Sequence, residues 1–69
     1  MPSQFWTTAV NVTIGDRIQL TLNHNYRVAA TVLAAMTINR HRVLVVKDDD
    51  GNERQISIPA LSSLCTIHI

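Results

Sequence analysis

The residues from Arg17 to Leu22 alternate strictly between polar and apolar side chains, and this alternation constrains the fold more than any other feature. Ile18 and Leu20 share one side of the repeat with Leu22. Successive side chains of a β-strand point to opposite faces, so a period of two predicts a strand with one buried and one solvated face.

Three further segments are predicted to be strands. The apolar run of residues 43–46 is typical of a central strand covered on both faces, residues 55–58 alternate again before Pro59 removes a ladder donor, and residues 64–69 form a final short strand. Sparse turn residues separate these strands. We expect turns at residues 15–16, 23–25 and 39–41, and a single helical turn at residues 60–62.

The segment from Tyr26 to Ile38 is ambiguous. Its alanines and Met36 favour a helix, whereas Val28, Val32 and their β-branched neighbours favour a strand. We prefer a long, bent strand, because the segment follows an asparagine-rich turn and a clear strand. A helix stays open as the alternative.

These elements predict a mostly β, small, five-stranded and strongly bent barrel that forms one domain over residues 1–69. Residues 15–69 would form the barrel, and residues 1–14 would form an N-terminal cap segment. We expect a short helical turn at residues 3–10, capped by Ser3, in which Phe5 and Trp6 cover one end of the barrel.

Composition limits the core and the setting. A chain of 69 residues buries only about 60% of its unfolded surface, and 46% apolar residues suffice for a compact core. That core must be mainly aliphatic, since Phe5, Trp6 and Tyr26 are the only aromatic residues. The lone Cys65 cannot form an intrachain disulfide, and we see neither a signal-peptide pattern nor an apolar run of membrane length. We therefore expect a cytoplasmic protein.

The stretch KDDDGNERQISI at residues 47–58 carries four of the five acidic residues. A hairpin turn is the main interpretation, because Asp50-Gly51 between two strands adopts left-handed dihedrals at little cost. A calcium loop needs ligands at alternating spacing, whereas Asp48, Asp49 and Asp50 are consecutive. An acidic docking tip is the third interpretation. We expect no metal and no cofactor.

Catalysis is not expected, and no catalytic residue is assigned. A nucleophile and base could come only from Cys65 or a serine with His24, His41 or His68, and the chain has neither a nucleophile elbow nor a phosphate-binding glycine loop. The apolar neighbours of Cys65 indicate a core residue, and the histidines lack the spacing of a zinc site.

Two classes of binding remain. A basic protein partner, or a partner that needs an apolar anchor, would contact Asp48, Asp49, Asp50, Glu53, Phe5 and Trp6. Single-stranded nucleic acid would stack on an aromatic ring and meet arginines, through Tyr26, Arg27, Arg40, His41 and Arg42. In each class the alternative is that these side chains only cover the core or face the solvent. We also expect that so short a chain can form homo-oligomers.

The order of segments resembles the Sm-like small β-barrel and, more narrowly, the Rof-like family of Rho inhibitors. The resemblance spans roughly residues 17–66 and is carried by IQLTL, LVV, GNERQISI and LSS, at residues 18–22, 44–46, 51–58 and 61–63. Rof-like proteins share the Sm fold, bind the transcription terminator Rho and oppose its contact with RNA. They are acidic overall, whereas this chain carries a net charge of +1, so only the acidic stretch keeps that character.

The resemblance implies a non-enzymatic binding module in transcription or RNA control that occupies the surface of a protein partner such as a termination factor. The alternative is an Sm-like module that binds single-stranded nucleic acid through Arg27, Arg40 and Arg42.

Overall fold

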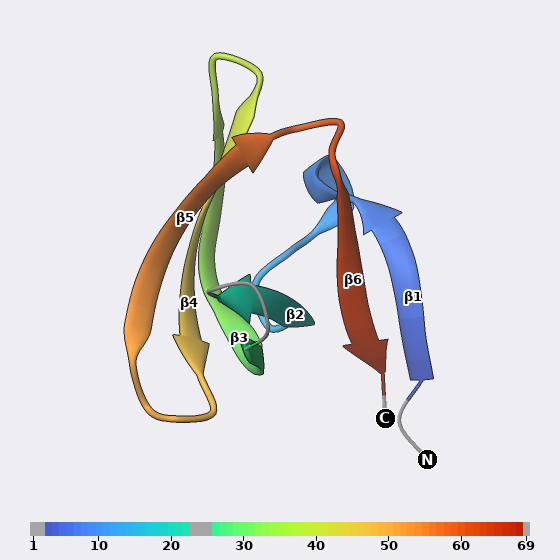
Figure 1. Ribbon diagram of the computed structural model, residues 1–69. Coiled ribbons are helices and arrows are strands. Elements are labelled where there is room, and N and C mark those ends of the chain that lie inside the picture. Colours follow the sequence, from blue (N-terminus) through green and yellow to red (C-terminus); the bar gives the residue numbers. More distant parts are fainter. Residues whose placement is uncertain (1–2, 23–25, 69) are drawn as a thin grey trace.

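The protein folds into six antiparallel strands, shown in Figure 1 as a computed structural model that describes residues 3–22 and 26–68. The expected turn at residues 23–25, with His24, lies outside the described residues. The strands are β1 (Ser3–Thr8), β2 (Arg17–Leu22), β3 (Tyr26–Ile38), β4 (His41–Asp48), β5 (Glu53–Pro59) and β6 (Ser63–His68).

The strands form one sheet in the order β1-β6-β2-β3-β4-β5, and this sheet is not closed. The mostly β class is confirmed, but the prediction of a five-stranded barrel is wrong. A sixth strand is present, and β1 and β5 are the two edges. In Figure 1, β5 and β6 diverge from the turn that joins them.

The sixth strand is the N-terminal segment, for which a helical turn was the wrong prediction. Phe5, Trp6 and the two following threonines favour extended backbone, and β1 pairs with β6 from Ser3↔His68 to Thr8↔Ser63. That ladder supplies the backbone hydrogen bonds that a helix would have supplied. Within residues 3–22 and 26–68, helical backbone is limited to the 3-10 turn η1 (Ala9–Asn11), and residues 60–62 form a turn that is not helical.

The ambiguous central segment is one strand, so the preferred interpretation of Tyr26–Ile38 is confirmed. β3 pairs with β2 through its first half and with β4 from Ala30 onward, and its register with β4 shifts between Val32 and Ala34. The turn before β2 contacts β3 at the same position, because the backbone N–H of Gly15 donates a hydrogen bond of 2.8 Å to the carbonyl oxygen of Val32. Bulges of this kind bend a strand, which lets β3 join the two halves of the sheet.

The core is aliphatic, as predicted. It lies against the inward faces of β2, β3 and β4 and includes one residue that follows η1; its buried members are Val12, Ile18, Leu20, Val28, Ala30, Val32, Leu44 and Val46. No helix in the described part of the chain is both long and apolar enough to cross a membrane.

Candidate binding groove

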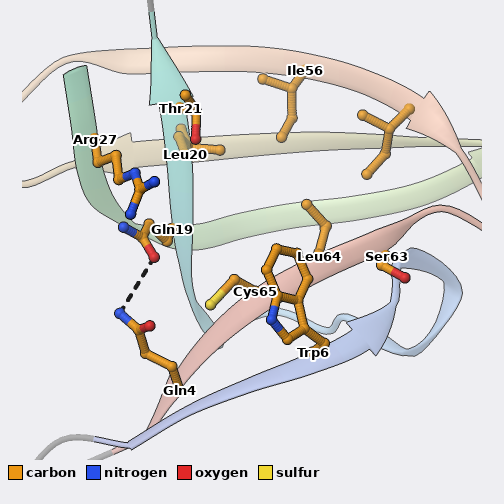
Figure 2. A pocket seen from close by; sticks show the side chains of 11 residues that line it. Gln4, Trp6, Gln19, Leu20, Thr21, Arg27, Ile56, Ser63, Leu64 and Cys65 are labelled. Atoms are coloured by element: carbon orange, nitrogen blue, oxygen red, sulfur yellow. Dashed lines mark hydrogen bonds between the residues drawn. The ribbon is translucent and has the colours of Figure 1, made fainter. Parts of the chain in front are cut away.

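A groove of about 440 Å³ lies between β5 on one side and β6, β1 and β2 on the other (Figure 2). It exists because β5 and β6 diverge and no described strand closes the sheet between them. Its lining residues are Gln4, Trp6, Gln19, Leu20, Thr21, Arg27, Ile56, Ile58, Ser63, Leu64 and Cys65.

The side chain of Trp6 stands over the β6 wall of the groove. Trp6 lies directly opposite Cys65 in the β1–β6 ladder, so both side chains point to the same face of the sheet. Cys65 is buried, whereas Trp6 is 74% exposed. Phe5 is the neighbour of Trp6 in an extended strand and therefore points to the opposite face. The structure thus separates two residues that the sequence analysis had grouped as one surface.

The floor of the groove is apolar but incompletely covered. Ile56 and Ile58 on β5, and Leu64 on β6, are each only partly buried, while Leu20 between them belongs to the core. Alternation in β5 points both isoleucines inward, but no described strand pairs with the edge of β5 opposite β4, and both side chains stay partly exposed to solvent. A ligand that covered these side chains would therefore remove apolar surface from water.

Polar groups line the rim. Gln4 on β1 donates a side-chain hydrogen bond of 3.3 Å to Gln19 on β2, above the intervening strand β6 (Figure 2). Arg27 at the start of β3 is exposed and is the only charged residue among the described residues of the lining. Among the described residues, none forms an ion pair with Arg27.

Asp48, the first residue of the acidic stretch, is used inside the hairpin between β4 and β5. Its buried carboxylate accepts hydrogen bonds of 2.9 Å from Arg54 Nε and from the backbone N–H of Asn52. The Arg54 hydrogen bond, followed by that of Asn52, lowers the pKa of Asp48. Gly51 has a φ of +88°, which agrees with the predicted turn.

The next two aspartates tie the hairpin to the neighbouring strands. Asp49 accepts a bidentate pair of hydrogen bonds from Arg17, at 2.9 and 3.0 Å, and the Arg17 guanidinium lowers the pKa of Asp49. The hydroxyl of Tyr26 donates to Asp50, and this contact raises the pKa of the phenol. All three aspartates therefore have partners within the fold, and Glu53 is exposed beside them.

The five residues considered for nucleic acid lie apart. Tyr26 and Arg27 begin β3, whereas Arg40 and His41 follow its end, after a strand of 13 residues that covers roughly 40 Å of path. Arg40 and His41 border a second hollow of about 590 Å³ with Leu61.

Arg42 is turned into the fold. Its guanidinium is buried and donates to the carbonyl oxygens of Ala9 and Val12, and to Thr37 Oγ1 at 2.9 Å. It holds the segment after β1 against β4, and this position removes it from the basic surface considered above.

The groove and its glutamines were not among the features predicted from the sequence. The alternation of Ile56 and Ile58 was visible, but it indicated a buried face rather than an open one. In the described part of the chain, no three His, Cys, Asp or Glu residues are grouped so as to hold a metal ion. Comparison with protein-family models, curated proteins and solved structures found no match to this chain.

Proposed function

We propose that this protein is a non-enzymatic binding module that holds a segment of a protein partner in the groove, with Trp6 as the anchor. The observation that supports this most is the 74% exposure of Trp6 at the mouth of a partly covered apolar groove. Tryptophan is enriched among the residues that dominate binding energy, and groove walls that exclude water strengthen such contacts.

The acidic stretch plays a different part in this proposal from the one that the sequence suggested. Asp48, Asp49 and Asp50 hold the hairpin in place, so their carboxylates are already engaged by Arg54, Arg17 and Tyr26. A partner would have to compete with these contacts. In contrast, a partner could cover the apolar surface of the groove without displacing any contact within the fold.

We extend the proposal to a partner that acts in transcription or RNA control, as the resemblance to Rof-like proteins implies. The lone cysteine fits a cytoplasmic setting. Single-stranded nucleic acid is the second candidate, because Trp6 and Arg27 line one groove and a base could stack on the indole while Arg27 meets a phosphate.

Photocrosslinking in the cells that naturally produce the protein tests the proposal. A benzophenone amino acid replaces Thr21 on the groove rim, or Leu33 as a matched exposed control outside the groove. We expect a protein adduct from position 21 only, which disappears when Trp6→Ala is added. An RNA or DNA adduct from position 21 would establish the second candidate instead. Equal adducts from both positions, or none, would overturn the proposal.

A further inference from the structure

One wall of the groove has an unpaired strand edge. β5 pairs with β4 from His41↔Pro59 to Lys47↔Glu53, and no described strand pairs with its other edge. An extended segment can add to such an edge through backbone hydrogen bonds. The seven residues of β5 span roughly 23 Å, which suits a segment of about seven residues.

The apolar floor fits the same kind of segment. Ile56 and Ile58 are two residues apart on β5 and both face the groove. A strand laid beside β5 repeats its side chains with the same period of two, so alternate apolar residues of that segment would cover these isoleucines and reach Leu64 across the groove.

The charge at the rim of the groove determines which polar residues in a bound segment would be favoured. Among the lining residues that the structure describes, Arg27 carries the only formal charge, and Gln4, Gln19 and the indole N–H of Trp6 are further hydrogen-bond donors. A guanidinium binds a carboxylate with two parallel hydrogen bonds. A nucleic-acid strand carries a phosphate at every nucleotide and is usually matched by several cations, whereas the described lining of this groove supplies one.

We infer that the groove binds an extended segment of the partner that adds to the free edge of β5, with apolar residues at alternate positions and a carboxylate that pairs with Arg27. The inference rests on the proposed function and specifies the chemistry of its partner.

An array of immobilised capped heptapeptides tests this specificity. The peptides carry Val, Ile, Leu or Phe at alternate positions, Thr or Ser between them, and Glu, Gln or Lys at one of the intervening positions. We expect the fluorescently labelled protein to favour Glu peptides about tenfold over Gln peptides, and Lys peptides least. Arg27→Glu should reverse the order in favour of Lys. This exposed position has no partner to lose among the described residues, so a thermal melt should show an intact fold.

Edge pairing has its own test on the best Glu peptide. Methylation of alternate backbone nitrogens on the β5 side should lower its affinity at least tenfold, whereas methylation of the other nitrogens should leave it within about twofold. Quenching or enhancement of the fluorescence of Trp6, the only tryptophan, reports binding in solution.

Several results would overturn the inference. On the array, the protein would bind no peptide, or would bind Glu, Gln and Lys peptides equally. Alternatively, Arg27→Glu would leave the order of peptide preference unchanged, or methylation of the peptide backbone would leave the affinity unchanged. Sedimentation that showed a dimer broken by Trp6→Ala would assign the groove to a second copy instead. If one of the peptide results above accompanied a Trp6-dependent adduct from position 21 to a different protein, the proposed function would stand and only its partner chemistry would fail.

Discussion

The guanidinium of Arg42 donates a hydrogen bond of 3.2 Å to the backbone oxygen of Ala9, although 33 residues separate the two in the chain. A second nitrogen of the same group bonds to Val12 O. Ala9 and Val12 are fully buried, so these carbonyls have little access to water. One side chain thus joins the segment that follows β1 to β4.

Replacing Arg42 should therefore destabilise the fold. We expect Arg42→Met to lower the free energy of unfolding by about 2–4 kcal/mol, because two buried carbonyl oxygens lose their donor. Urea denaturation followed by circular dichroism measures this. Arg40→Met, at an exposed residue of the adjoining turn, should change stability by less than about 0.5 kcal/mol. Equal effects would show that the Arg42 contacts are not structural.

The hairpin aspartates should make stability fall in acid. Hydrogen bonds from Arg54 and Arg17 lower the pKa values of Asp48 and Asp49 in the folded state. Their contribution is therefore complete above the unfolded pKa of about 3.9 and is lost as the pH falls through the lower folded values. Thermal melts from pH 6 to pH 2 should show a decreasing Tm.

The acid effect can be assigned to Asp48 by substitution. Asp48→Asn should lower Tm at pH 6 and flatten its dependence on pH, because the amide keeps no charge to lose. Glu53→Gln removes an exposed carboxylate from the same hairpin and is the control. A wild-type pH dependence in Asp48→Asn would contradict the assigned role of this carboxylate.

Tyr26 is the only tyrosine, so its ionisation can be followed by ultraviolet absorbance. Its hydroxyl donates to Asp50, and that carboxylate stabilises the neutral phenol and repels the phenolate, which raises the pKa. We expect ionisation above the usual value of about 10, and a shift back toward it in Asp50→Ala. Asp16→Ala, whose carboxylate bonds to Thr13 instead, serves as the control. Identical titrations in all three proteins would exclude the contact in solution.

The turn between β3 and β4 should accept glycine. Asn39 and Arg40 have φ values of +48° and +66°, as in a type I′ hairpin turn, and arginine is strained in this region. Arg40→Gly should raise the free energy of unfolding by about 0.5–1 kcal/mol in urea denaturation. Gly51→Ala, at a φ of +88°, should have the opposite sign. A loss of stability in Arg40→Gly would contradict the turn geometry.

Most strands could be predicted from side-chain periodicity, because alternation over β2 and β5 reports directly which face is buried. The N-terminal segment lacks this alternation, although its aromatic residues and threonines favour extended backbone. Its strand exists because β6 offers a free edge to pair with, and no local pattern in Phe5 or Trp6 records the presence of that edge. This dependence on pairing with β6 explains why the segment forms the strand β1 and not the expected helical turn.

The sequence by itself determined the strands from β2 to β6, the aliphatic core and the turn at Asp50-Gly51, since these depend on local dihedral preferences and on apolar spacing. Tertiary structure alone decided which charged residues remain available. Asp48 and Arg42 read as surface charges, yet the fold buries both, and it leaves Arg27 exposed in the groove. The reason is that burial depends on partners that only the folded chain brings together. Arg42 bonds to residues 33 and 30 positions away, and the hairpin between β4 and β5 folds Arg54 back onto Asp48.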